Sequence, residues 1–230
     1  MRIADNIIMF KLEAPYNQYT YPVLIWDENH LVLIDTGYPT QTEALQKAVV
    51  DAGFNVETLT EIIITHQDWD HLGGLSELTK VAPKAKILAH MDEVPYIEKQ
   101  KTPIKLGAML ERYDTLTYEQ KVACNVRKEM YDNLNVKVSQ LLTEGEMIPI
   151  CGGIDVIHTP GHTPGHIALF LEESGIMVAG DAVNHFDGQL ESSNPVFTQD
   201  MTLANESFEK IKAIDMNGII SYHCGYLKLK

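Results

Sequence analysis

The decapeptide Thr65–Gly74 places four side chains that can bind a metal within six positions: His66, Asp68, Asp70 and His71. It directly follows the apolar run Ile62–Ile64, which is typical of a buried β-strand. Imidazole and carboxylate groups are common ligands of zinc, iron and manganese. The sequence therefore predicts a metal-binding cluster where a buried strand ends, a position at which α/β proteins often carry their chemistry.

Three other apolar runs end in residues of the same kind. His162 follows the segment 155–157 through a short turn, Asp181 follows the segment 176–179, and His223 follows the segment 219–222. A single histidine or aspartate after a strand is typical of a turn. Because the ends of several strands can meet at one edge of a sheet, the four sites together predict one shared centre.

The rest of the chain predicts two halves, each with strands and helices. Apolar segments predict strands over 7–10, 23–26, 31–34, 62–64, 86–89, 136–142, 147–148, 153–158, 167–171, 176–179 and 218–222. A capping box of Thr40 and Glu43, with a stop at Gly53, predicts a helix over 40–52, and others are predicted over 74–81 and 203–215. This order predicts an α/β fold of two packed sheets with helices outside.

Residues 93–135 differ in composition from the rest of the chain. They are more highly charged, and their apolar residues recur with a helical period. Thr117 and Gln120 can cap a helix that runs to about Asp132. We interpret the segment as a helical insertion over the cleft of one domain that spans 1–230, because it is too short for a core of its own. Its basic residues, between Lys99 and Lys128, favour a solvated surface; a platform for an anionic substrate is the alternative.

Composition narrows the class of partner. The formal net charge of −14 argues against nucleic acid, because phosphate would be repelled on average. No apolar stretch approaches the roughly 20 residues that cross a bilayer, and the N-terminus lacks the apolar core of a signal peptide. We therefore expect a cytoplasmic protein with a small-molecule substrate, no nucleic acid and no membrane; a homodimer is compatible with the sequence.

The order of motifs along the chain resembles that of the metallo-β-lactamase superfamily. The resemblance is carried by Asp35-Thr36-Gly37, by His66–His71 with Gly73-Gly74, by Thr159–His166, by Gly180-Asp181 and by His223. It implies an αββα sandwich of two mixed β-sheets flanked by helices, with a dinuclear metal site in the cleft at one sheet edge.

The resemblance also implies a role for each residue of the centre. His66, Asp68 and His162 would hold the first metal; Asp70, His71 and His223 would hold the second; Asp181 would bridge them. Asp70 would in addition orient a metal-bound hydroxide and move its proton. Asp35 would support the site from outside, and His166 would be structural, as we also expect for His30, His90 and His158.

Asp68 departs from the family pattern, which has histidine at this position. An aspartate adds a negative charge and a hard oxygen donor, so it shifts metal preference from zinc toward manganese or iron. We expect two divalent metal ions, most simply zinc, with iron or manganese as alternatives because of Asp68. A side chain too short to reach the first metal would leave one site filled.

The resemblance implies a hydrolase, and we expect it to cleave a small ester, lactone or thioester. Related lactonases carry a tyrosine soon after the bridging aspartate, whereas this chain has His185 there, which we predict as a substrate-contacting or acid/base residue. The absence of an export signal, of a glutathione-binding C-terminal extension and of a basic surface disfavours the β-lactamase, glyoxalase II and nuclease branches. The alternatives are an iron-dependent oxidoreductase of the same fold, persulfide dioxygenase-like or di-iron, and a non-catalytic metal-binding module.

Overall fold

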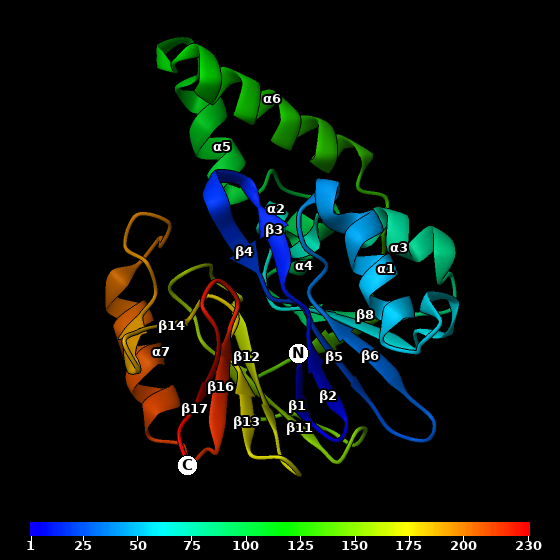
Figure 1. Ribbon diagram of the computed structural model, residues 1–230. Coiled ribbons are helices and arrows are strands. Elements are labelled where there is room, and N and C mark those ends of the chain that lie inside the picture. Colours follow the sequence, from blue (N-terminus) through cyan, green and yellow to red (C-terminus); the bar gives the residue numbers. More distant parts are fainter.

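Two β-sheets stacked face to face form the centre of the molecule (Figure 1). The computed structural model describes the backbone of residues 1–230 and all side chains except that of Tyr16. The first sheet has seven strands in the order β1 (Arg2–Ala4), β2 (Ile7–Met9), β5 (Val23–Trp26), β6 (Leu31–Ile34), β7 (Glu61–Ile64), β8 (Lys86–His90) and β9 (Gln140–Leu142). The second has six, in the order β10 (Met147–Ile148), β11 (Ile154–His158), β12 (Ile167–Leu171), β13 (Ile176–Val178), β16 (Gly218–Ser221) and β17 (Gly225–Lys228).

Both sheets are mixed. Strands β6 to β9 pair in parallel, and so do β13 and β16, whereas the other pairs are antiparallel. Parallel neighbours need a crossover connection. Helices α1 (Thr42–Asp51), α3 (Leu75–Val81) and α7 (Met201–Lys212) lie in such connections, so the covering helices follow directly from the parallel pairing.

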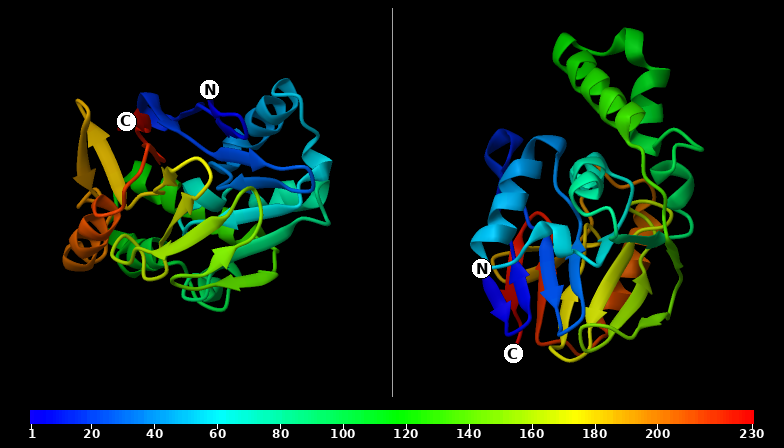
Figure 2. Two further views of the ribbon diagram at one scale, coloured as in Figure 1. Left: turned by 90° about the horizontal axis from the view of Figure 1, so that it is seen from below. Right: turned by 90° about the vertical axis from the view of Figure 1, so that its right-hand side faces the viewer.

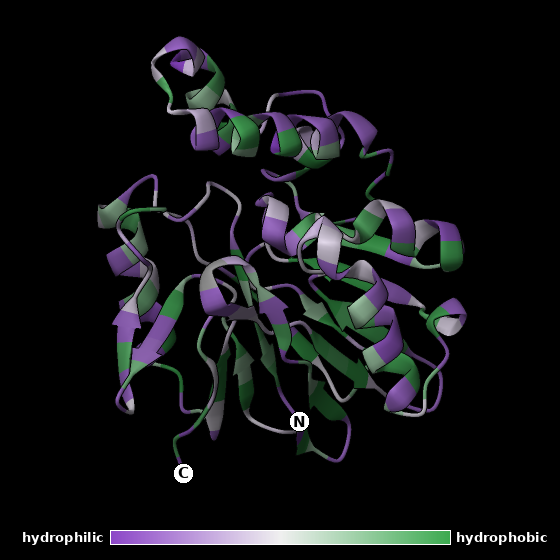
Figure 3. Ribbon diagram, turned by 45° about the horizontal axis from the view of Figure 1, so that its top comes forward, coloured by the Kyte–Doolittle hydropathy of each residue, from purple (hydrophilic) through white to green (hydrophobic). Residues whose placement is uncertain are grey.

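Strand β7 shows why its apolar run is continuous. Ile62 and Ile64 pack in the core that also holds Leu45 of α1 and Leu78 of α3, whereas Ile63 packs between the two sheets. A strand covered on both faces needs apolar side chains at every position. Figure 3 shows the same division: the strands are mostly hydrophobic, and the helices outside them carry hydrophilic faces.

Helix α7 covers the far side of the second sheet. Its Ile211 lies in a third core with Ile157, Met177 and Ile219, which come from three different strands. Helices therefore lie outside both sheets, and the predicted αββα sandwich is confirmed.

The segment predicted as a helical insertion does form helices: α4 (Val94–Ile97), α5 (Ile104–Glu111) and α6 (Tyr118–Asn133). The capping box at α6 is confirmed, since the Gln120 N–H donates to Thr117 Oγ1 at 3.3 Å and the Thr117 N–H donates to Gln120 Oε1 at 3.0 Å. Helices α5 and α6 project from the rest of the molecule, with α2 (Trp69–Leu72) below them (Figures 1 and 2). Among the described residues, no helix combines the length and the apolar character of a membrane span.

Several boundaries differ from the prediction. Helix α1 begins at Thr42 because Pro39–Gln41 form a 3₁₀ turn, so the capping box of Thr40 and Glu43 is wrong. Of the predicted strand over 136–142, the structure forms the shorter strand β9, Gln140–Leu142. Two hairpins were not predicted: β3 (Leu12–Ala14) with β4 (Gln18–Thr20), and β14 (Val183–Phe186) with β15 (Gln189–Ser192).

Candidate metal centre

The ends of four strands bring all seven predicted ligands together. His66 and Asp68 follow β7, Asp70 and His71 lie on the short helix α2, and His162, Asp181 and His223 come after β11, β13 and β16. They form three overlapping groups: two groups of three residues, and a third in which Asp181 joins one histidine from each. Within each group the candidate ligand atoms all lie within 4.8 Å of one another. The first sheet thus supplies four of the residues and the second sheet supplies three.

The first group contains His66, Asp68 and His162. Asp68 Oδ2 lies 3.3 Å from His66 Nε2 and 3.0 Å from His162 Nε2. The aspartate is therefore long enough to face both histidine nitrogens. The number of metals that the centre holds stays a prediction.

The second group contains Asp70, His71 and His223. Asp70 Oδ2 lies 3.9 Å from His71 Nε2 and 3.3 Å from His223 Nε2. Asp181 stands between the two groups, because its Oδ1 lies 3.3 Å from His71 Nε2 while its Oδ2 lies 3.4 Å from His162 Nε2. One carboxylate thus faces both groups, which is the position expected of a bridging ligand.

The donor atoms fit a metal. Among the described residues, His66 Nε2, His71 Nε2 and Asp181 Oδ1 are buried and find no hydrogen-bond partner. Buried polar atoms are nearly always paired, so three unpaired ones in one cluster call for a ligand. Nitrogen and carboxylate donors in this combination suit zinc, iron or manganese.

The outer nitrogens of two histidines are held by neighbouring side chains. Asp35 Oδ2 lies 2.8 Å from His71 Nδ1, and the same carboxyl group accepts hydrogen bonds from the Thr65 N–H and hydroxyl at 2.9 and 2.8 Å. His162 Nδ1 lies 3.0 Å from Ser193 Oγ. Such contacts fix the ring orientation and direct Nε2 inward, so Asp35 lies where a supporting residue is expected.

His166 lies beside the centre and uses both nitrogens for other contacts. Its Nδ1 lies 2.7 Å from Thr159 Oγ1, and its Nε2 accepts a hydrogen bond from the Asp181 N–H at 3.0 Å. Burial and the nearby histidines hold its pKa well below the usual value, which agrees with Nε2 acting as an acceptor. The structure therefore gives His166 the structural position that we expected.

Comparison with known proteins identifies the family of the chain. The sequence model of the metallo-β-lactamase superfamily matches residues 17–216. The chain belongs to this superfamily. It is 30% identical over 177 residues to the uncharacterized protein YobT of Bacillus subtilis (strain 168), an alignment that covers 77% of the chain and 66% of YobT. It is 28% identical over 222 residues to the probable metallo-hydrolase YflN of the same organism, with 88% and 79% covered.

A solved structure shows the same fold. A metallo-β-lactamase family protein from Thermus thermophilus superposes with a TM-score of 0.78 at 20% identity, over 99% of this chain and 76% of that one. Relatives with named substrates are more distant: an N-acyl homoserine lactonase from Bacillus cereus is 23% identical over 231 residues, covering 88% of this chain and 80% of the lactonase. An atrochrysone carboxyl ACP thioesterase from Pseudocercospora fijiensis is 21% identical over 180 residues, covering 76% of this chain and 41% of the thioesterase.

Oppositely charged groups lie next to the candidate ligands. Burial acts to raise the pKa of Asp68, but the Lys105 ammonium and two histidines hold it well below its usual value. Burial acts to lower the pKa of His71, but the carboxylates of Asp181 and Asp35 raise it to about 10. The carboxylates thus dominate the field in the centre, which favours a cation there.

Three residues of the centre were not predicted from the sequence. Lys105 of α5 contacts Asp68 Oδ2 and lies 2.9 Å from His162 Nε2. Glu93, which is fully buried, accepts hydrogen bonds from the Gln67 N–H at 2.8 Å and the Gly165 N–H at 2.7 Å. Tyr222 donates its hydroxyl hydrogen to the Asp70 carbonyl at 2.7 Å.

The sequence held only weak signals for these three residues. Lys105 lies in the basic stretch that we assigned to a solvated surface, and the structure turns this lysine inward. Tyr222 directly precedes His223, and Glu93 opens the insertion. None of these three positions indicates which of the loops that carry candidate ligands the side chain contacts.

His185 lies on β14 outside the three overlapping groups. Its Nε2 lies 3.2 Å from the Gly225 carbonyl oxygen, so this nitrogen is placed to donate to the backbone. Its role toward a substrate stays a prediction.

The other histidines also lie outside these three groups. His30 pairs with Asp27 at 3.0 Å, and His90 stacks on His158 with ring centroids 4.2 Å apart. His90 and His158 form a fourth cluster with Asp92, but their rings are parallel within 9°, which does not direct both nitrogens at one point.

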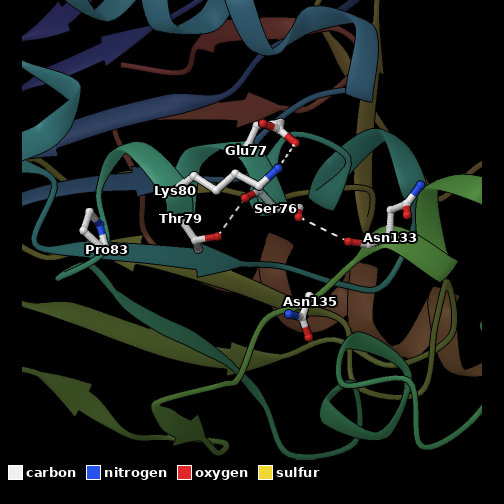
Figure 4. A pocket seen from close by; sticks show the side chains of 7 residues that line it. All are labelled: Ser76, Glu77, Thr79, Lys80, Pro83, Asn133 and Asn135. Carbon is white, nitrogen blue, oxygen red and sulfur yellow. Dashed lines mark hydrogen bonds and ion pairs between the residues drawn. The ribbon is translucent and has the colours of Figure 1, made fainter.

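A separate hollow lies on the surface beside α3 and the end of α6 (Figure 4). It is lined by Ser76, Glu77, Thr79, Lys80, Pro83, Asn133 and Asn135. Glu77 and Lys80, both on α3, form an ion pair at 2.6 Å. None of its residues belongs to the ligand groups, so we do not assign the chemistry to it.

Proposed function

We propose that the chain is a metal-dependent hydrolase that cleaves a small ester, lactone or thioester. The observation that carries the proposal is the convergence of seven candidate ligands in two groups that Asp181 joins. The distant relatives named as a lactonase and a thioesterase support an acyl compound as substrate.

Two divalent cations, most simply zinc, would be held in this centre. His66, Asp68 and His162 form the first subsite; Asp70, His71 and His223 form the second subsite; Asp181 serves both. When bound, the cations would polarise the carbonyl oxygen under attack and lower the pKa of the attacking water. Asp68 makes manganese or iron an alternative to zinc, because it replaces a nitrogen with a hard oxygen.

Asp70 is the residue that we propose to move the proton. Burial acts to raise the pKa of this carboxyl group, but the hydrogen bond with His223 lowers it, so Asp70 is ionised and able to accept. The Tyr222 hydroxyl holds the Asp70 backbone, and the Tyr222 hydroxyl itself accepts from the Gly37 N–H at 3.2 Å. Asp70 would take the proton of the attacking water at its carboxylate and pass it to the leaving alcohol or thiol.

A substrate panel tests this function. Esters, lactones, thioesters and phosphodiesters are offered to the zinc, manganese and iron forms, and we expect cleavage of an acyl compound that a chelator abolishes. Asp70→Asn should lower kcat by a factor of about 10² to 10⁴, with metal content measured in parallel. The exposed Asp51, which pairs with Lys47 on α1, gives a matched control in Asp51→Asn. Cleavage of phosphodiesters alone would contradict the substrate class.

Asp68 also supports a second candidate, an iron-dependent oxidoreductase of the same fold. A carboxylate in the first subsite makes the donor set harder and more favourable to iron than three histidines would be. Protein that retains iron and changes its absorption spectrum with oxygen or a persulfide, without hydrolysing the panel, would favour this candidate.

A further inference from the structure

Helix α5 places a positive charge inside the first ligand subsite. The Lys105 ammonium contacts Asp68 Oδ2 and lies 2.9 Å from His162 Nε2. These two atoms are also candidate metal donors, and they lie only 3.0 Å from each other. The ammonium therefore takes the hydrogen-bond acceptors that a cation in this subsite needs.

A metal cation and the Lys105 ammonium compete for the same two atoms, Asp68 Oδ2 and His162 Nε2. Zinc binds nitrogen and oxygen ligands at about 2.0–2.2 Å, so it would need the same lone pairs of Asp68 and His162. Two positive charges at such short range also repel each other strongly. Lys105 must withdraw before the first subsite can be filled.

The second subsite has no such competitor. Among the described side chains, the ion pairs of Asp70 and Asp181 are made with histidines alone. The two subsites therefore differ in what a cation must displace.

The backbone of α5 is tied to the same loop. The Ile104 N–H donates to Gln67 Oε1 at 2.9 Å, and Gln67 stands between His66 and Asp68 in the chain. Lys105 is the next residue of α5, and its side chain is 27% exposed, so it has room to move toward solvent. Withdrawal of Lys105 would remove one of the two polar contacts described here between the start of α5 and residues 67–68.

We propose that Lys105 is a built-in competitor for the first metal subsite, so that the two subsites fill in order. The second subsite takes a cation first; the first subsite takes one only when Lys105 withdraws, which loosens α5. By thermodynamic reciprocity, whatever moves α5 away also raises the affinity of the first subsite. The inference rests on the ligand assignment of the proposed function, but not on hydrolysis.

Zinc titration of the full chain, stripped of metal beforehand, tests the filling order. Calorimetry and elemental analysis should show two binding steps in the wild type, with dissociation constants at least about 30-fold apart. Lys105→Met should tighten the weaker step by at least about tenfold, and Lys105→Arg should keep the steps apart. Lys101→Met removes a lysine that lies over the Tyr96 ring instead, and should match the wild type. Equal constants in the wild type and Lys105→Met would overturn the proposal.

A second measurement uses the unaltered chain, so it does not depend on the folding of a variant. Hydrogen exchange over 104–111 should stay slow at one equivalent of zinc and become faster at two. Unchanged or slower exchange at the second equivalent would contradict the release of α5.

A variant of one candidate metal ligand distinguishes a failure of the filling order from a failure of the ligand assignment. His223→Ala should remove the tight step and leave the weak one. If both steps persist unchanged, the ligand assignment itself fails. If the filling order holds but no substrate of the panel is cleaved, only the proposed function fails.

Discussion

Glu93 joins the two loops that carry ligands from different sheets. One carboxyl oxygen accepts from the Gln67 N–H, between two ligands of the first loop, and the other accepts from the Gly165 N–H, in the loop that holds His162. Burial raises its pKa from 4.5 to about 7, although its hydrogen bonds act in the opposite direction. A carboxyl group that binds a proton this readily makes the stability of the centre sensitive to pH.

Glu93→Gln should change how stability depends on pH. Because the pKa of Glu93 is higher in the folded chain, its contribution is fully present below about pH 4.5 and is lost as pH rises through about 7. The wild type should lose about 3 kcal/mol relative to Glu93→Gln across this range. Urea unfolding of both chains with chelator, from pH 5 to 8, measures the difference. A difference that stays constant over this range would refute the assignment.

Asp35→Asn should weaken metal binding without removing a ligand. Asp35 has φ of 59°, a left-handed conformation that aspartate tolerates, and this aims its carboxylate at both Thr65 and His71. Loss of such a supporting carboxylate typically costs about 10- to 100-fold in metal affinity. Zinc titration should show this loss at the second subsite, where His71 lies. Asp51→Asn is the control, and an unchanged affinity in Asp35→Asn would contradict the supporting role.

The residues that could be predicted share a local signal. Each of the seven candidate ligands, and Asp35 as well, stands at or shortly after the end of an apolar strand, so the chain itself marks the position. Lys105 has no such mark, and Glu93 stands shortly after the end of β8, but nothing local indicates which segment either side chain contacts. Their partners Asp68 and Gln67 lie 37 and 26 residues away, so the contacts depend on how the insertion folds back. Sequence patterns do not specify that placement.

At the scale of elements, the turn before His162 is pressed against helix α7. Gly161 has φ of 129°, and a Cβ atom there would overlap the backbone nitrogen of Ala204 in α7. Its carbonyl oxygen also accepts from the Gln199 and Asp200 N–H groups at 3.1 and 3.0 Å. Glycine is therefore required twice, for the backbone conformation and for the contact with the helix.

Gly161→Ala should destabilise the chain more than strain alone would. Gly53 provides the matched control, because it has φ of 94° but open space where a Cβ would stand. Backbone strain costs of order 1 to 3 kcal/mol in both variants, and overlap with α7 should add roughly 1 to 3 kcal/mol in Gly161→Ala. Chemical denaturation compares the two. Equal losses would show that the turn can move away from α7.

The unpredicted hairpins show why short elements escape sequence analysis. Strands β14 and β15 have exposed or half-exposed residues at most positions, so they lack a clear apolar alternation. Their turn, Asp187-Gly188, has positive φ at both residues, 47° and 79°, and is the one local signal of the hairpin. The long buried strands were predicted because burial on one or both faces leaves a pattern in the residues themselves.

At the scale of the whole molecule, the centre ties the two sheets together. His66, Asp68, Asp70 and His71 follow a strand of the first sheet, whereas His162, Asp181 and His223 follow strands of the second. Without a cation, the carboxylates of Asp68, Asp70 and Asp181 gather at this junction in a chain whose net charge is −14. A cation bound by residues of both sheets would therefore join the sheets.

Metal removal should consequently lower the melting temperature of the entire fold. At a free zinc concentration of about 100 times Kd, one site stabilises the folded state by roughly 2.7 kcal/mol. For a chain of this size each kcal/mol shifts Tm by roughly 2–4 °C, so chelation should lower Tm by about 5–10 °C. Calorimetric scans with zinc and with chelator measure the shift. His223→Ala should lose most of it, because the second subsite fills first. Asp51→Asn should retain it, since the exposed Asp51 pairs with Lys47 on α1 and belongs to none of the ligand groups. A shift that persists in His223→Ala would place the stabilising cation elsewhere than in the second subsite.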